Sequence, residues 1–218
     1  MKRISTLLNS ASLALLMVFS VALQATTYYV DSAAGNDAND GLSELLAWQT
    51  ITHLNTKTFA PGDNILFKRD GIYAGQFNLQ GSGESGSVIT LSAYGSGEKP
   101  ILMANDADQA ALYMTNNEYI EIDNLQFTNN HDGLDVNYGV LIEAPANFGE
   151  LNHIIFDNVE FVDIKGKTEK CHGMLATNAK DDGTTVTYSN YKHFHVTNSD
   201  FRNIDGPGFK FRDRSGSR

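Results

Sequence analysis

The chain has 218 residues, a formal net charge of −10 and a single cysteine, Cys171. The acidic balance does not favour nucleic acid or an anionic membrane as a partner, and one cysteine excludes an internal disulfide. A chain of this length is expected to form one domain whose core is stable without disulfide bonds.

The first 25 residues have the pattern of an export signal. A basic start, Lys2 and Arg3, precedes an apolar run over residues 13–23, and the small residue Ala25 suits a signal peptidase. The apolar run is too short to span a bilayer comfortably, which argues against a membrane anchor. We therefore expect residues 1–25 to be a cleaved signal peptide and the protein to be secreted or periplasmic.

Residues 26–64 are expected to form an N-terminal strand and a capping helix. The segment TYYV is typical of a strand. In WQTITHLN the apolar residues Trp48, Ile51 and Leu54 recur at roughly helical spacing. A short amphipathic helix of this kind can cover the apolar end of a stack of repeats.

The polar segment SAAGNDANDG, which follows Asp31, is rich in acidic and amide side chains. Calcium prefers oxygen ligands of this kind, but the ligand spacing and the terminal glutamate of a twelve-residue calcium loop are absent. The sequence therefore favours plain turns here and leaves calcium as the alternative interpretation.

Three similar segments follow in the second half of the chain: YIEIDNLQFTN from Tyr119, HIIFDNVEFVD from His153 and HFHVTNSDFRN from His193. Each has two apolar residues two positions apart, then an asparagine, then a phenylalanine. The apolar pairs predict strands with one buried face, and asparagine suits the bent backbone between two strands. The asparagines are expected to stack as a ladder of amides: Asn124, Asn158 and Asn198.

The spacing of these asparagines is 34 and then 40 residues, so the extra residues must lie in loops. Such variation fits a parallel β-helix better than a propeller. A third strand aligns in GVLIEA, GMLATN and GFKFRD, which begin at Gly139, Gly173 and Gly208.

Extending the alignment toward the N-terminus pairs Ile65 with Val88 and Ile120. We therefore predict an all-β parallel β-helix of about five coils over residues 65–218. The chain ends in RDRSGSR without a closing helix, and an open last coil exposes strand edges. We expect the β-helix to be C-terminally truncated, with catalytic coils missing.

Four segments together resemble the opening of exported bacterial right-handed parallel β-helix proteins of the pectate-lyase-like group. They are YYVDSAAGNDANDG, the W-x-T-I pattern of WQTI, PGDNILFKRDGIYAGQF and SGSVITLSAYGSGEKPIL. The group includes polysaccharide lyases, glycoside hydrolases and members without an assigned reaction, and the resemblance covers roughly residues 26–211. It implies a right-handed β-helix that acts on or binds a polysaccharide.

The lyases of this group cleave uronic-acid polymers by β-elimination with a Lys or Arg base, commonly helped by Ca²⁺ or a second basic residue. The resemblance implies catalytic roles for Lys210 and Arg212, because GPGFKF resembles the Gly-Phe-Lys element of one pectate lyase family. Both alternate with Phe209 and Phe211 and so project from one face. The alternative is that they are solvated strand residues, since the calcium-like segment HDGLDV around Asp132 lies two coils away.

Three further residues are candidates for substrate binding. Glu143 is an outward acid, but a hydrolase needs two carboxyl groups about 5 to 9.5 Å apart, and its column continues with Thr177 and Arg212. His195 is expected on an outward face, in contact with sugar or with solvent. Tyr191 either stacks on a sugar ring or packs within a loop.

Cys171 and His172 are interpreted as an incidental pair in a loop rather than a metal or nucleophile site, and no metal ligands are assigned. The sequence thus predicts a secreted polysaccharide-active protein, lyase-like and directed at a uronic-acid-containing glycan. A non-catalytic carbohydrate-binding or surface module and a glycoside hydrolase fragment are the alternatives.

Overall fold

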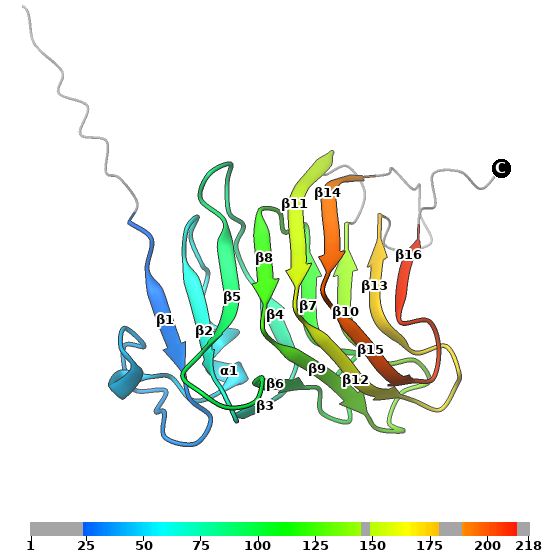
Figure 1. Ribbon diagram of the computed structural model, residues 1–218, viewed down its shortest axis with the longest axis horizontal. Helices are drawn as coiled ribbons and strands as arrows, with labels where there is room; N and C mark the ends of the chain where they lie inside the picture. Colours follow the sequence, from blue (N-terminus) through cyan, green and yellow to red (C-terminus); the bar gives the residue numbers. More distant parts are fainter. Residues whose placement is uncertain (1–23, 145–148, 179–188, 213–218) are drawn as a thin grey trace, which may run out of the picture.

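The computed structural model describes residues 24–144, 149–178 and 189–212. Within these ranges the chain forms three sheets in which every pair of neighbouring strands runs parallel (Figure 1). Sheet A contains β1 (Thr27–Val30), β2 (Asn64–Lys68), β5 (Ile89–Tyr94), β8 (Ile120–Asp123), β11 (Glu150–Asp157) and β14 (Asn190–Thr197). Sheet B contains β3 (Ile72–Ala74), β6 (Ile101–Met103), β9 (Gln126–Asn130), β12 (Glu160–Lys165) and β15 (Asp200–Ile204).

Sheet C contains β4 (Phe77–Leu79), β7 (Ala110–Thr115), β10 (Tyr138–Glu143), β13 (His172–Thr177) and β16 (Phe209–Arg212). Each coil visits sheets A, B and C in turn, so β2, β3 and β4 form one coil and β14, β15 and β16 another. This arrangement confirms the predicted right-handed parallel β-helix. The signal-peptide prediction falls on residues 1–23, outside the described ranges, apart from its last two positions.

The repeated segments stack in the predicted register. Ile154 of β11 lies opposite Ile120 of β8 and Phe194 of β14. In sheet B the rings of Phe127 and Phe161 stack with centroids 5.4 Å apart, and those of Phe161 and Phe201 at 4.6 Å. Because each coil contributes a similar side chain to the same interior position, the core is a set of continuous apolar columns.

The asparagine corners are confirmed, and the amide ladder is confirmed for one of its two steps. Asn124, Asn158 and Asn198 all have positive φ, between 50° and 56°. The Asn158 amide donates to Asn124 Oδ1 at 2.8 Å, as predicted. The Asn198 amide instead donates to Asp157 Oδ1 at 2.7 Å, so the second step of the ladder was wrong.

The predicted register of the first coils was also wrong. Leu91, not Val88, lies opposite Ile65, and Ile89 lies opposite Ile120. Val88 lies just before β5, and the strand begins at Ile89. The four residues V-I-T-L contain three apolar side chains and so permit either register, and the pairing of Leu91 with Ile122 decides between them.

The N-terminal cap contains two short helices, η1 (Glu44–Leu46) and α1 (Ile51–Leu54). The predicted helix is therefore a single turn, capped by the Thr50 side chain, and it buries Ile51 and Leu54. Trp48 lies outside the helix, bridges to Val30 and stacks on Tyr28 with ring centroids 4.8 Å apart. Neither helix, and no other in the described ranges, is long and apolar enough to cross a membrane.

The acidic side chains of the cap stabilise turns and the start of the helix. Asp31 Oδ1 accepts hydrogen bonds from the backbone of Ala33 and Ala34, and Asp37 accepts from the backbone and hydroxyl of Thr50. The pKa of Asp37 is lowered, although burial opposes this, because these hydrogen bonds favour the carboxylate. The turn interpretation is therefore the one that the contacts support.

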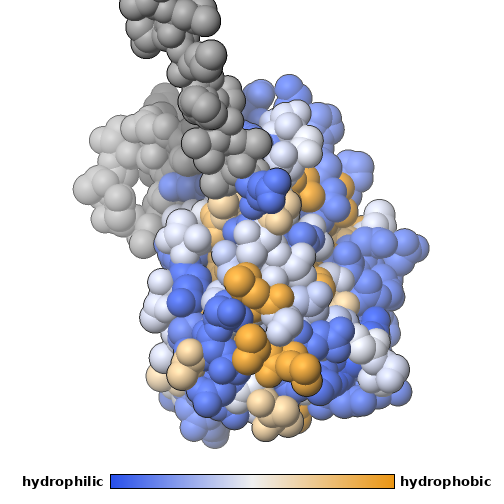
Figure 2. Space-filling model, turned by 90° about the vertical axis from the view of Figure 1, so that its left-hand side faces the viewer, coloured by the Kyte–Doolittle hydropathy of each residue, from blue (hydrophilic) through white to orange (hydrophobic). Residues whose placement is uncertain are grey.

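Apolar side chains gather on the surface at the end of the molecule that carries the cap (Figure 2). Three leucines in and beside η1 are exposed to solvent, and Leu45 has 93% of its surface accessible. The others are Leu42 and Leu46. The cap thus covers the interior columns with Trp48, Ile51 and Leu54, and turns a smaller set of apolar groups outward.

The asparagine corner gives the first prediction. Alanine at position 158 would have to adopt a positive φ and would lose the amide contacts, so Asn158→Ala should lower the free energy of unfolding by about 1 to 3 kcal/mol. Asn158→Gly loses the same contacts but tolerates positive φ, so its loss should be smaller. Urea unfolding of both variants measures the difference. An alanine variant as stable as the glycine variant would contradict this account of the corner.

Candidate functional site

Glycines in sheet C determine which neighbouring side chains point outward. A side chain at Gly139 would meet Phe161, and one at Gly173 would meet Phe201 at 2.7 Å and the Gly208 carbonyl oxygen at 2.4 Å. These positions therefore face the crowded interior and admit only glycine. The preceding residues of the two strands, Tyr138 and His172, turn the opposite way.

A small apolar cluster lies on this outward face, separate from the main core. It contains Leu141 and Leu175, each 3% exposed, with Ala110, and the rings of Tyr113 and Tyr138 pack against it. Leu141 and Leu175 belong to the column that continues to Lys210, as the sequence predicted. The face therefore has an apolar centre with polar and charged groups around it.

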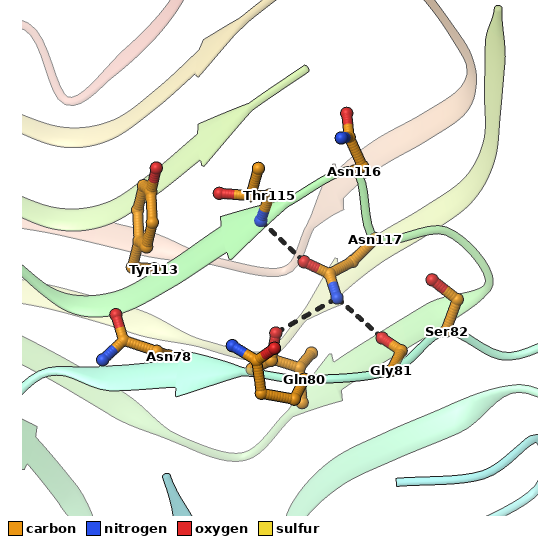
Figure 3. Close-up of a pocket in the computed structure, with 9 residues that line it drawn as sticks. Asn78, Gln80, Gly81, Ser82, Tyr113, Thr115, Asn116 and Asn117 are labelled. Carbon is orange, nitrogen blue, oxygen red and sulfur yellow. Dashed lines mark hydrogen bonds between the residues drawn. The ribbon is translucent and has the colours of Figure 1, made fainter. Parts of the chain in front are cut away.

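A polar pocket of about 460 Å³ lies at the β4 and β7 end of this face (Figure 3). Its lining is mainly amide and hydroxyl groups, and Tyr113 stands at one side: the polar residues are Asn78, Gln80, Ser82, Tyr113, Thr115, Asn116 and Asn117. Asn117 is buried and fixes the wall, because it accepts from the Thr115 amide and donates to the carbonyls of Leu79 and Gly81.

Tyr113 links this pocket to Glu143 on the next coil. Its hydroxyl donates to Glu143 Oε2 at 2.6 Å. Burial, and then this contact with the carboxylate, raise the pKa of Tyr113, so the phenol stays protonated and holds the carboxylate in place. Glu143 is therefore an outward acid beside the pocket, as the sequence analysis proposed.

Lys210 and Arg212 lie at the other end of the face, on β16. The register places Lys210 beside Leu175, and Arg212 beside Thr177, which in turn lies beside Glu143. Phe209 lies on the interior side, where its ring stacks on Phe194 with centroids 5.8 Å apart, and 41% of its surface is exposed. The two cations thus share the outward face, two coils beyond Glu143, as predicted.

His172, set aside in the sequence analysis as an incidental loop residue, is instead the first residue of β13 and is 4% exposed. Its ring meets that of Tyr138 at 5.6 Å, and Nδ1 is enclosed without a hydrogen-bond partner among the described residues. Burial is the main cause that lowers the pKa of His172, and the charges of Lys210 and Arg212 lower it further, against a backbone contact with Cys171. The imidazole is therefore neutral at pH 7.

Sequence reasoning missed His172 and Tyr138 because the strand alignment began at the glycine that follows each of them. The signal was present as an aromatic or imidazole side chain directly before a glycine required by the core, in YG at 138–139 and HG at 172–173. Only the inward direction of the glycines shows that the preceding side chains lie on the outward face.

The remaining sequence candidates lie elsewhere. Tyr191 packs against the main core, in ring contact with Phe194 and Phe211, and its hydroxyl donates to the Thr177 carbonyl at 2.9 Å. Its burial raises its pKa. Tyr191 therefore has the packing role that was weighed against sugar stacking, and we do not assign it to the site.

His195 is exposed on the outward face of sheet A, opposite Ile155. Ile155 lines a hollow of about 620 Å³ together with Asp123 and Asp157. Asp157 already accepts from the side chains of Thr197 and Asn198, and these bonds lower its pKa. The sheet A hollow is thus separate from the site on sheet C.

No three acidic, histidine or cysteine side chains converge as metal ligands in the described parts of the chain. The carboxylates of Asp31 and Asp37 are engaged by backbone amides, as shown above.

Comparisons with known proteins support the fold. No family model matches the chain. The chain is 33% identical over 142 residues to a lacto-N-biosidase from Bifidobacterium longum subsp. longum, and the match covers 51% of this chain and 8% of that protein. The chain therefore spans a small part of the length of this curated relative.

Two crystal structures of a GH136 lacto-N-biosidase from Eubacterium ramulus match with a TM-score of 0.68 at 21% identity. The match covers 81% of this chain and 34% of that one, and it shows a shared β-helix fold. An alginate lyase from Paenibacillus sp. str. FPU-7 matches with a TM-score of 0.45, which is too low to support an argument. The fold is one that carbohydrate-active enzymes use.

The buried imidazole gives a prediction on stability and pH. The folded-state pKa of His172 lies below its ordinary value of 6.5. As the pH falls through 6.5, His172 therefore takes up a proton in the unfolded chain but stays neutral in the folded chain. The free energy of unfolding contributed by neutral His172 is thus complete above about pH 6.5 and declines below it. His172→Gln should therefore lose less stability than the wild type between about pH 7.5 and about pH 5.5.

Urea unfolding at the two pH values measures this difference. His195→Gln is the matched control, because His195 is exposed on another sheet, and it should keep the wild-type pH dependence. Equal losses in the wild type and His172→Gln would contradict the assignment of a buried neutral imidazole.

Proposed function

We propose that the chain acts on an acidic glycan bound across the outward face of sheet C, and cleaves it by β-elimination. The observation that carries this proposal is the placement of Lys210 and Arg212 on the same face as the amide-lined pocket. The relatives support the broader class, since the proteins matched by sequence and by structure include lacto-N-biosidases. The acidic substrate and the elimination are our proposal from the side chains.

The pocket end of the face suits the neutral part of a glycan. Asn78 and Gln80 line it with side-chain amides, and Tyr113 offers an aromatic edge. Sugar hydroxyls both donate and accept hydrogen bonds, so a surface of amides and hydroxyls can satisfy them without a charge. The apolar Leu141 and Leu175 lie between this end and the cations and can contact the carbon faces of the sugar rings.

The cationic end suits a sugar carboxylate. Arg212 has a planar guanidinium that can bind a carboxylate in a bidentate manner, and Lys210 lies two residues away on the same strand face. The whole chain carries a net charge of −10, so this pair is a local attraction for an anion on an otherwise acidic protein. A uronic acid seated here would have its carboxylate neutralised, which makes the neighbouring C–H bond more acidic.

The cationic end gives a prediction on binding. Arg212→Gln should weaken binding of a defined oligouronate about tenfold or more, because a charge-assisted bidentate contact contributes roughly 1.5 to 3 kcal/mol. Lys192→Gln removes a cation from sheet A, where Lys192 pairs with Glu150 at 3.5 Å, and is the control. Its affinity should stay within about twofold of the wild type.

Isothermal titration calorimetry with oligogalacturonate, oligomannuronate and a neutral oligosaccharide of equal length measures these affinities. Wild-type binding to the acidic but not the neutral oligosaccharide is expected. Loss of affinity in Lys192→Gln equal to that in Arg212→Gln would contradict the placement of the anion on sheet C.

A second candidate is hydrolysis of a glycosidic bond, and the identity of 33% with a lacto-N-biosidase favours it. Glu143, held by Tyr113 beside the pocket, would be one of the two carboxyl groups that such a reaction needs. The described strands of sheet C supply no second carboxyl group. Product analysis separates the two: elimination gives ultraviolet-absorbing unsaturated ends, whereas hydrolysis of a lacto-N-biose-terminated glycan gives new ends without that absorbance.

A further inference from the structure

The side chains beside the cations suggest which group moves the proton, and this inference rests on the proposed elimination. The base of an elimination must be unprotonated at working pH and must lie beside the sugar whose carboxylate is neutralised. The resemblance assigns this role to Lys210. A lysine that also binds the carboxylate is protonated, so it cannot accept the proton in the same step.

His172 meets the requirements that Lys210 does not. It is a buried polar residue of the face, 4% exposed, and its Nδ1 has no hydrogen-bond partner among the described residues. A buried imidazole nitrogen without a partner loses the hydrogen bonds that it made in water, which is a cost to the folded state. The imidazole is also close enough to Lys210 and Arg212 for both charges to act on it.

Tyr138 lies beside His172 on the neighbouring coil. The two rings are edge to face at 5.6 Å, and the register pairs their backbones directly. Burial raises the pKa of Tyr138, against the charge of Arg212, so its hydroxyl keeps its proton at neutral pH. A neutral imidazole and a protonated phenol therefore lie side by side, within reach of the electrostatic effect of the cations.

We propose that His172 and Tyr138 are the catalytic base and acid of the sheet C site. His172 takes the proton from the carbon next to the sugar carboxylate, which Lys210 and Arg212 neutralise. The electron pair left on that carbon forms the C=C bond as the bond from the next carbon to the glycosidic oxygen breaks. The departing oxygen takes the Tyr138 proton, and the imidazolium then returns its proton to the phenolate, so both groups are restored.

Four groups set the protonation of this pair. Lys210 and Arg212 on β16 disfavour imidazolium, the Cys171 backbone favours it, and Glu143 acts on Tyr138 from the far end of the face. The charge of Lys210 should keep the acidic limb of the pH–rate profile below the ordinary histidine value of 6.5. Removing that charge should move the limb upward.

The test uses the full chain with oligogalacturonate and oligomannuronate, and follows unsaturated ends by absorbance and binding by calorimetry. His172→Gln should reduce kcat by about 10² to 10⁴-fold while oligouronate affinity changes by less than about threefold. His195→Gln, the matched control on sheet A, should keep wild-type kcat. In His172→Ala, added imidazole should restore part of the activity, which a misfolded variant would not show.

Lys210→Met distinguishes the two candidate bases. If His172 is the base, this variant should bind oligouronate more weakly, retain measurable turnover, and show its acidic limb at higher pH. Turnover lost in Lys210→Met with oligouronate affinity unchanged would assign the base to Lys210 and overturn the proposal.

The remaining outcomes are also decisive. Full kcat in His172→Gln would overturn the His172 assignment and leave the elimination standing. A wild-type protein that binds oligouronate without forming unsaturated ends, or that binds none, would overturn the proposed elimination itself and the His172 role with it.

Discussion

The hydrogen-bonded register between successive coils is the constraint on which the rest of the structure depends. Each strand lies parallel to its equivalent in the next coil, about 4.8 Å away, so a position in the repeat becomes a column in space. Interior columns stack phenylalanines in sheet B and combine aliphatic groups with Phe156 and Phe194 in sheet A. Exterior columns carry side chains that the core does not select, and there the coils differ from one another.

That division explains how much the sequence could predict. The core columns repeat, so Ile120, Ile154 and Phe194 could be aligned without coordinates, and the columns of Lys210 and Glu143 followed from the same alignment. The register failed at Val88, where adjacent apolar residues allow two alignments and only pairing with the neighbouring coil selects one. The cap was shorter than its pattern suggested, because Trp48 joins the first strand by a backbone bridge instead of extending the helix.

The exterior was less predictable because it depends on where the backbone departs from simple alternation. Gly139 and Gly173 face the core ahead of the inward residues Val140 and Met174, which puts Tyr138 and His172 outside. No two-residue period could show this, and His172 was read as a loop residue. Tyr191 illustrates the converse, since an aromatic residue in a polar segment proved to close the interior beside Phe211.

The sheet C face thus combines a sugar-sized polar pocket, an apolar centre, two cations and a neutral imidazole, all placed by the stacking of coils. A crystal structure of the protein with a bound oligouronate would test most directly whether this face binds an acidic glycan. The account predicts sugar density across β10, β13 and β16, with a carboxylate against Arg212 and a ring carbon facing His172. Density confined to the sheet A hollow beside Asp123 and Asp157 would contradict it.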